Sequence, residues 1–327
     1  MNTIHVGDAL DVLRTLPDES VQTCITSPPY YGLRDYGCDG QIGLEKTIDK
    51  YVQRLVEVFR EVRRVLRDDG TVWLNLGDSY AGGRTGRDDG DRDQRMKGRG
   101  DRYTSSLYDS KQRSVPSGLK PKDLCGIPWR VAFALQADGW YLRSDIIWHK
   151  PNPMPESVKD RCTKAHEYIF LLSKSARYYF DAEAILEPFA DDRNGASGAK
   201  SLPYSKGSGR NDTLSDGRRP GLGVSPTRSG RNRRTVWTVS TRSYKGAHFA
   251  VYPPELIEPC VLAGSAEGDT VLDPFSGAGT TGVVALAKRR KYIGIELNPT
   301  YAEMAARRIR NEAPMFNAVE VVGIETP

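Results

Sequence analysis

The sequence predicts an α/β protein built on a mostly parallel, doubly wound sheet. Apolar runs of strand length alternate with segments whose apolar residues recur at helical spacing, a pattern typical of sheets covered by helices. Several of these runs end directly in an acidic or hydroxyl residue, as at Asp8, Ser27 and Asp273. Because open α/β sheets bind ligands at the carboxyl ends of their strands, the same residues indicate where the functional site lies.

The predicted strands follow from short apolar or alternating runs. They cover residues 3–6, 21–25, 71–76, 140–148, 166–172, 177–180, 270–273 and 292–296. The predicted helices follow from an apolar face that recurs every three or four residues. They cover residues 9–16, 48–66, 123–137, 255–262, 280–288 and 299–311. Pro17 ends the first of these helices, and Asp68-Asp69-Gly70 ends the second.

Two stretches interrupt this pattern, residues 81–122 and 191–235. Both are rich in glycine, serine, arginine and aspartate and contain few large aliphatic residues, so neither can bury enough apolar surface to fold alone. They divide the chain into five expected segments, 1–80, 81–122, 123–190, 191–235 and 236–327. Their arginines suit contacts with phosphates, and a solvated linker of mixed charge is the alternative interpretation.

The composition sets broad limits on function. The chain has 327 residues, with 47 Lys and Arg against 42 Asp and Glu, a balance that is compatible with a nucleic-acid partner without requiring one. The 5 cysteines are scattered and never spaced as Cys-x-x-Cys, which predicts free thiols in a reducing compartment and no metal site. No signal peptide and no long apolar run is visible, so the expected location is cytoplasmic.

The strand predicted at 21–25 ends in an unusual loop, Ser27-Pro28-Pro29-Tyr30. Two successive prolines fix two φ angles, remove two backbone donors and force extended geometry on the residues that precede them. The chain therefore leaves the strand as a stiff loop with free carbonyl groups and an aromatic ring at its end. Ser27 and a proline carbonyl can accept the two hydrogens of a planar amino group, and Tyr30 can stack on the ring that carries it. A loop that only turns the chain is the alternative.

A second motif, Asp273-Pro274-Phe275-Ser276-Gly277-Ala278-Gly279-Thr280, joins the strand 270–273 to the helix 280–288. Its glycines let the backbone approach a ligand closely, and the start of the helix offers N–H groups. Glu296 ends the next strand, where a carboxylate can hold a ribose diol. The glycine spacing alone also fits an NAD-binding fingerprint, but the acid and the proline that precede the glycines make the turn unfavourable for binding a pyrophosphate.

Together these motifs resemble those of the DNA amino-methyltransferases, which methylate exocyclic nitrogens of cytosine or adenine. That family combines a strand followed by Ser, Asp or Asn before Pro-Pro-Tyr with a glycine turn that binds S-adenosyl-L-methionine. The order found here, substrate motif first and cofactor motif last, resembles the family's beta arrangement. The resemblance implies a Rossmann-like, S-adenosylmethionine-dependent methyltransferase fold that is circularly permuted and carries inserted variable loops, of which 191–235 is a candidate target-recognition region.

The resemblance also implies roles for individual residues. The expected catalytic residues are Ser27, Pro28, Pro29 and Tyr30. The expected cofactor-binding residues are Asp8, Phe249, Asp273, Pro274, Phe275, Gly277, Gly279, Thr280 and Glu296. Of these, Asp273 is expected to face the methionine ammonium group. Asp8 is expected to contact the cofactor, to cap the helix that follows it, or to do both. The residues expected to meet the target base or the DNA are Tyr31, Arg34, Lys150, Asn152 and Ser157.

The implied substrate is double-stranded DNA, with the target base flipped into the pocket and methylated by direct displacement. Serine before Pro-Pro-Tyr resembles the cytosine-N4 enzymes, and adenine N6 is the alternative target. A cognate restriction endonuclease is a compatible partner, and the oligomeric state stays open. Three other functions also stay open: an NAD-dependent oxidoreductase, a non-catalytic DNA-binding protein, and methylation of protein or RNA amines, although those last families favour asparagine and the opposite motif order.

Overall fold

The computed structural model describes residues 2–33, 37–82, 115–188, 230–242, 251–312 and 319–323. The chain divides into two units, residues 1–181 together with 235–327, and residues 182–234. The second unit contains the short 3-10 helix η1 (Glu183–Ile185). Most of the predicted variable stretches, together with Arg34 and Phe249, lie outside the described residues. None of the helices that the structure describes has the length and apolar content needed to cross a bilayer.

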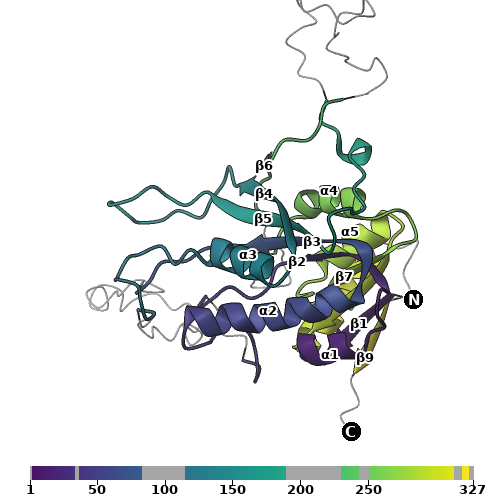
Figure 1. Cartoon of the computed structure of the whole chain (residues 1–327), viewed down its shortest axis with the longest axis horizontal. Coiled ribbons are helices and arrows are strands. Elements are labelled where there is room, and N and C mark those ends of the chain that lie inside the picture. Colours follow the sequence, from purple (N-terminus) through teal and green to yellow (C-terminus); the bar gives the residue numbers. More distant parts are fainter. Residues whose placement is uncertain are drawn as a thin grey trace, which may run out of the picture. The chain divides into compact units, whose positions relative to one another are not determined.

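The first unit contains a nine-stranded sheet in the order β6-β4-β5-β3-β2-β7-β8-β1-β9 (Figure 1). Its strands are β1 (Asn2–Val6), β2 (Val21–Thr26), β3 (Leu66–Leu76), β4 (Tyr141–His149), β5 (His166–Ser173), β6 (Val236–Thr238), β7 (Thr270–Asp273), β8 (Lys291–Glu296) and β9 (Val319–Gly323). Among the described strands only β5 is antiparallel to its neighbours. The predicted mostly parallel sheet is therefore confirmed.

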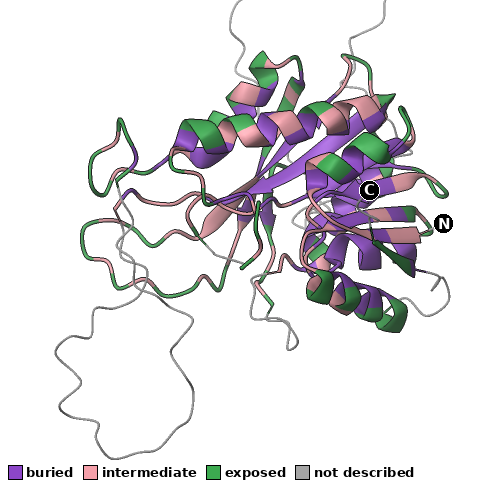
Figure 2. Cartoon of the chain, turned by 90° about the horizontal axis from the view of Figure 1, so that it is seen from below, coloured by how far each residue is buried: buried purple, intermediate pink, exposed green. Residues whose placement is uncertain are grey.

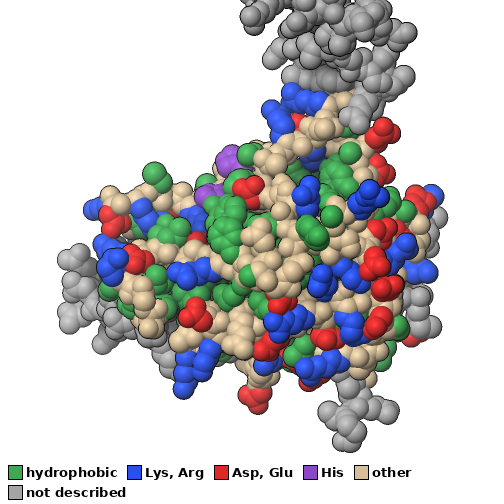
Figure 3. Space-filling view, viewed as in Figure 1, with side chains coloured by type: hydrophobic (Ala, Val, Ile, Leu, Met, Phe, Trp, Pro, Cys, Tyr) green, Lys and Arg blue, Asp and Glu red, His purple; other side chains and the backbone are tan. Residues whose placement is uncertain are grey.

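Helices cover both faces of this sheet, as expected for a doubly wound fold (Figures 1 and 2). One layer consists of α1 (Ala9–Thr15), α2 (Ile48–Val65) and α3 (Ile127–Ala137), and the other of α4 (Pro254–Gly264), α5 (Thr280–Ala287) and α6 (Pro299–Glu312). All six residues of β2 are buried between the layers. On the face that carries α2, basic and acidic side chains are interspersed, so this face does not form a patch of one charge (Figure 3).

The prediction differs most from the structure at one strand and two boundaries. The strand predicted at 177–180 is wrong, because Phe180 instead stacks on Trp73 with ring centroids 6.2 Å apart and covers the sheet. β3 begins at Leu66 rather than 71, so Asp68-Asp69-Gly70 continues the chain as a strand instead of only ending a helix. α3 begins at Ile127 rather than 123, after Gly126, whose φ of 70° is unsuited to a helix. β6 and β9 were not predicted.

The sheet order explains how distant motifs meet. β2 and β7 are parallel neighbours, with Cys24 opposite Leu272, so the loops that follow both strands emerge at the same edge. The reversed direction of β5 brings its first residues to that edge, whereas the other strands reach the edge with their last residues. The carboxyl edge of the sheet therefore collects the ends of β1, β2, β3, β4, β7 and β8 together with the start of β5.

Candidate active site

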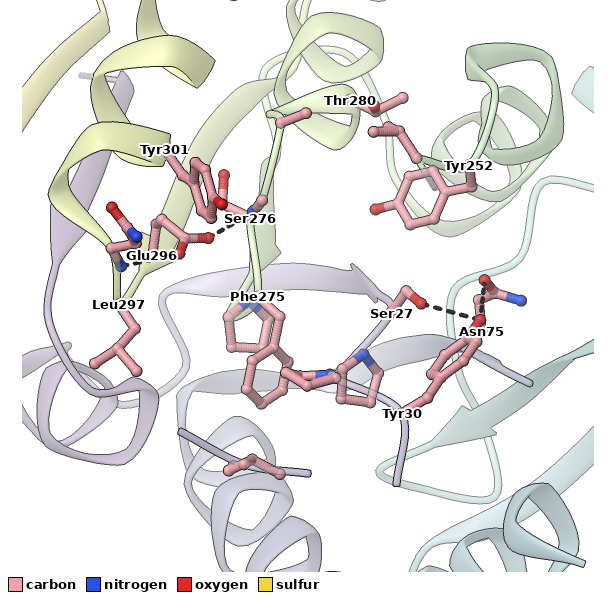
Figure 4. Close-up of a pocket in the computed structure, with 18 of the residues that line it drawn as sticks. Ser27, Tyr30, Asn75, Tyr252, Phe275, Ser276, Thr280, Glu296, Leu297 and Tyr301 are labelled. Atoms are coloured by element: carbon pink, nitrogen blue, oxygen red, sulfur yellow. Dashed lines mark hydrogen bonds between the residues drawn. The ribbon is translucent and has the colours of Figure 1, made fainter. Parts of the chain in front are cut away.

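A pocket lies at this edge of the sheet, and both predicted motifs line it. Figure 4 shows Glu296, Leu297 and Tyr301 on one side, Ser27, Tyr30 and Asn75 on the other, and Phe275 between them. The structure thus joins the loop after β2 and the turn after β7 in one cavity. This juxtaposition is what a reaction between a bound cofactor and a bound substrate requires.

The loop after β2 is held firmly in place. The Tyr51 hydroxyl, on α2, donates a hydrogen bond of 2.9 Å to the Pro29 carbonyl. The Tyr30 carbonyl accepts the Leu33 N–H at 3.2 Å, so the turn after the prolines is also fixed. Since the Pro29 carbonyl already has this partner, the Pro28 carbonyl is the better placed of the two to accept a hydrogen from a substrate.

Tyr30 is fixed at both its hydroxyl and its ring. Its hydroxyl contacts the Glu167 carboxylate at 2.7 Å, the Asn75 side-chain oxygen at 3.2 Å and the Ser27 hydroxyl at 3.4 Å. Burial, and then the charge of Glu167, raises the pKa of Tyr30 well above its usual value of 10.0, so the phenol stays protonated and neutral. A Cβ atom on Gly77 would lie 2.4 Å from the Cε2 atom of this ring, so glycine is required there for the ring to pack against β3.

Replacing Gly77 with alanine is expected to lower the methyl-transfer rate about 10- to 100-fold, because the added methyl group must push the Tyr30 ring out of position. Binding of S-adenosylmethionine, measured by calorimetry, should change little, since the three atoms nearest to the added methyl group all belong to the Tyr30 ring. Gly323→Ala is the matched control, because a Cβ atom there meets nothing within 4 Å. Full activity of the Gly77 variant would show that the position of Tyr30 does not matter.

On the other side of the pocket, Glu296 organises the glycine turn. Its carboxylate accepts the Gly277 N–H at 2.8 Å and the Asn298 N–H at 3.0 Å. The carboxylate therefore takes a backbone N–H that a pyrophosphate would need, and its negative charge would repel that group. This geometry disfavours the NAD-binding alternative and leaves a carboxylate suited to a ribose diol.

Burial raises the pKa of Glu296 above its usual value of 4.5 despite these two N–H donors. Protonation therefore starts at a higher pH than for an ordinary glutamate, and the protonated carboxyl accepts hydroxyl groups less well. We expect affinity for S-adenosylmethionine to be retained above this raised pKa and to fall as the pH drops through it. Calorimetric titration of the free protein with the cofactor between about pH 5 and pH 8 measures this. Glu296→Gln should bind more weakly with a flatter profile, and an unchanged profile would exclude Glu296 as its source.

Asp273 lies beneath the pocket rather than in its wall. Its side chain is completely buried, and it accepts hydrogen bonds from the hydroxyls of Thr26 at 2.6 Å, Thr281 at 2.6 Å and Tyr252 at 3.1 Å. The Phe275 N–H adds a fourth bond of 3.1 Å, yet burial raises the pKa of Asp273. Asp273 does not line the pocket, and its carboxylate ties the end of β2 to the cofactor turn; its expected contact with a methionine ammonium group stays a prediction.

The remaining predicted residues divide into two groups. Asp8, Pro274, Phe275, Gly277, Thr280 and Lys150 line the pocket. Asp8 also accepts the Leu10 N–H at 2.9 Å, so it caps α1 as the alternative interpretation proposed. Gly279, Tyr31, Asn152 and Ser157 do not line it. Gly279 packs against α6, where an added Cβ atom would lie 2.9 Å from the Cβ atom of Ala305. The Tyr31 ring packs on the Tyr51 ring, with centroids 5.5 Å apart. The Asn152 carboxamide forms hydrogen bonds with the backbone N–H and carbonyl of Thr241.

Several pocket residues were not predicted, among them Asn75, Trp148, Glu167 and Tyr301. Asn75 carries a signal that the sequence does offer, a single amide inside the apolar run Val72–Leu76. Glu167 has no such local signal, because it begins a strand instead of ending one. In the described part of the chain, no three His, Cys, Asp or Glu side chains gather as metal ligands would.

The residues present fit a nucleoside cofactor that carries an amino acid. Glu296 suits a ribose diol, the apolar side chains of Phe275 and Leu297 suit an adenine ring, and the backbone at Gly277 is open to close approach. Beside them, Ser27 and the Pro28 carbonyl offer acceptors for an amino group. The fold and the site therefore define a doubly wound α/β enzyme that transfers a group from such a cofactor to a planar amine.

Comparisons with known proteins specify this class further. A family model described as DNA methylase, covering N6 and N4 enzymes, matches residues 21–307. The type II methyltransferase M.Cfr9I of Citrobacter freundii is 49% identical over 310 residues, covering 95% of this chain and 88% of the relative. The type II methyltransferase M.SmaI of Serratia marcescens is 50% identical over 307 residues, covering 94% and 90%. The chain belongs to the N6/N4 DNA methylase family, whose methyl donor is S-adenosyl-L-methionine.

Solved structures agree with this assignment. A putative DNA modification methylase from Thermus thermophilus, complexed with S-adenosyl-L-methionine, matches with a TM-score of 0.59 and 25% identity, covering 98% of this chain and 100% of that one. The PvuII DNA methyltransferase, described as cytosine-N4-specific, matches with a TM-score of 0.60 at 19% identity over 100% and 96% of the two chains, which supports the fold. The predicted S-adenosylmethionine-dependent methyltransferase fold is confirmed.

Proposed function

We propose that this DNA methyltransferase methylates the N4 amino group of cytosine in duplex DNA. The observation that carries the proposal is the pocket that Ser27 and Pro28 line together with Glu296 and the glycine turn. Serine as the first residue of the loop favours cytosine through its resemblance to the cytosine-N4 enzymes. Adenine N6 is the second candidate, because the same two acceptors also fit that amino group.

In the proposed mechanism the target base leaves the duplex and enters the pocket, since its amino group cannot be reached inside the stack. The Tyr30 ring packs against the base. Ser27 and the Pro28 carbonyl accept the two amino hydrogens, which draws the nitrogen lone pair out of conjugation with the ring and aims it across the pocket. Bound S-adenosylmethionine supplies an electrophilic methyl group on a positively charged sulfur. The residues of the chain then contribute mainly through positioning and exclusion of water.

Methyl transfer from labelled S-adenosylmethionine to duplex DNA of mixed sequence tests this function, followed by digestion to nucleosides and mass spectrometry. N4-methylcytosine is the expected product. N6-methyladenine instead would preserve the fold, the cofactor and the mechanism but would contradict the cytosine assignment. Label in neither nucleoside, with the cofactor bound, would contradict DNA as the substrate.

We further propose that the enzyme acts beside a type II restriction endonuclease that cuts the same DNA sequence. The support is the similarity to relatives named as type II methyltransferases. DNA modified by this enzyme should then resist the partner nuclease, whereas the same DNA incubated without S-adenosylmethionine should be cut. Equal cutting of both samples would contradict the partnership.

A further inference from the structure

A partly buried ion pair, Lys150 with Glu167, forms part of the pocket wall beside Tyr30. Lys150 follows β4 and Glu167 lies near the start of β5, and the Lys150 N–H donates to the Ala165 carbonyl at 2.8 Å, so the two strands hold both residues in register. The two side chains are only 18% and 16% exposed. Taking most of the water away from a charged pair costs free energy, which makes a purely stabilising role a weak explanation for its presence.

The hydrogen-bonding capacity of the pair is only partly used. One Glu167 oxygen accepts from the Tyr30 hydroxyl and the other from the Lys150 ammonium group. The ammonium group also lies over the Trp148 ring, 4.2 Å from its centroid. An ammonium group has three N–H donors, and among the described residues only Glu167 accepts from it. Lys150 therefore keeps donor capacity for a molecule bound in the pocket.

The pair is connected to the residues proposed to hold the target amino group. A chain of contacts leads from Ser27 through the Tyr30 hydroxyl and Glu167 to Lys150. Ser27 offers an acceptor at one end of this chain and Lys150 a cationic donor at the other, while the Tyr30 hydroxyl and the Glu167 carboxylate between them hydrogen-bond within the chain. Cytosine presents the matching order along its pairing edge, the N4 amino donor, the N3 acceptor and the O2 acceptor. Adenine presents an amino donor, the N1 acceptor and a C2–H group, which cannot accept a hydrogen bond.

We propose that Lys150 donates a hydrogen bond to O2 of the flipped cytosine and that Glu167 holds Lys150 in place for this contact. The inference rests on the proposed function, because it needs a base whose amino group sits at Ser27. It assigns Lys150 a role in selecting cytosine over adenine, and it makes Glu167 a positioning residue for both Lys150 and Tyr30. With adenine bound, the C2–H group would cover the remaining donors of the ammonium group without accepting a hydrogen bond from them, so adenine would be disfavoured at this position.

The test replaces Lys150 with methionine and O2 of the target cytosine with sulfur. Methionine keeps much of the length of lysine without its donors, and 2-thiocytosine keeps N4 and N3 but offers a weaker acceptor. The duplexes carry the base at the position that the wild-type enzyme methylates, and kcat/KM is measured for both bases with both proteins. Effects of sulfur on duplex stability cancel when the two proteins are compared.

The wild-type enzyme is expected to prefer cytosine to 2-thiocytosine by about 10-fold or more, and Lys150→Met should lose this preference. Glu167→Gln, which keeps the shape of the side chain but removes its charge, should weaken the preference in part. Lys288→Met is the matched control, because it breaks an ion pair with Glu258 on the α4 and α5 layer. Its preference should equal that of the wild type.

An equal preference in the wild-type and Lys150→Met proteins would overturn the inference and leave the proposed function intact. Absence of N4-methylcytosine with the wild-type enzyme would instead contradict the proposed function itself. Binding of S-adenosylmethionine by each variant, measured by calorimetry, shows that the cofactor side is folded. A merely structural ion pair would lower transfer to both bases by the same factor, and this result would also overturn the inference.

Discussion

Replacing Ser27 with alanine is expected to lower the single-turnover rate of methyl transfer about 100- to 1000-fold, the loss typical of removing one preorganised hydrogen-bonding group from a reaction centre. The Ser27 hydroxyl is the acceptor that we assign to one amino hydrogen, and without it the nitrogen lone pair stays conjugated with the base. The Pro28 carbonyl alone cannot orient the amino group. Quenched-flow transfer from labelled S-adenosylmethionine measures the rate directly.

Two further measurements make this result specific to Ser27. Affinity for S-adenosylmethionine should stay within about twofold of the wild type, since Ser27 and Glu296 lie on opposite sides of the pocket (Figure 4). Ser20→Ala is the control, because the Ser20 hydroxyl donates only to the Pro17 carbonyl in the turn before β2. Turnover within about threefold of the wild type in Ser27→Ala would contradict the role of the serine.

Replacing Asp273 with alanine is expected to lower the free energy of unfolding by about 3–5 kcal/mol. The substitution leaves the buried hydroxyls of Thr26, Thr281 and Tyr252 without their common acceptor and removes the link between β2 and the cofactor turn. Relief of the desolvation that raises the pKa of Asp273 offsets part of this loss, but the unsatisfied hydroxyls and the cavity remain. Urea unfolding followed by circular dichroism measures the difference.

The conservative variant separates hydrogen bonding from charge. Asp273→Asn keeps an acceptor, and the hydroxyls of Tyr252 and Thr281, which lie 2.5 Å apart, can reorient toward it. The free energy of unfolding should therefore fall by at most about half as much as in Asp273→Ala. Asp68→Ala removes an acid whose side chain is 79% exposed, and it should change stability by no more than about 0.5 kcal/mol. A loss below about 1 kcal/mol in Asp273→Ala would contradict the assigned role of the carboxylate.

The parts of the site that could be predicted from sequence are those that are local in the chain. The Ser27–Tyr30 loop and the turn from Pro274 to Thr280 each carry their chemistry within a few residues. Glu167 could not be found in this way, because its place at the active edge depends on the reversed direction of β5, a property of the whole sheet.

Much of the fold could also be predicted, because its signals are local in the chain. The prediction failed where contacts between distant residues determine the structure. Buried parallel strands such as β2 are recognisable as apolar runs. Residues 177–180 have the composition of a strand, but Phe180 finds its partner in Trp73 on the sheet face and pairs with no strand. Asp273 stays a predicted cofactor residue, but nothing local in the sequence indicates its hydrogen bond with Thr26, which lies on a strand distant in the chain.

The position of β1 has a consequence for biosynthesis. β1 lies between β8 and β9, with Thr3 opposite both Ile293 and Glu320, so both of its neighbours are made last. At about 5–20 residues per second, β1 leaves the ribosome roughly 15 to 60 s before either partner exists, and both of its edges stay unpaired meanwhile. Val6 and Glu296 are also opposite each other in the β1–β8 pair. A chain that stalls before β8 would therefore carry the substrate loop and the glycine turn but would lack Glu296, the carboxylate that organises this turn.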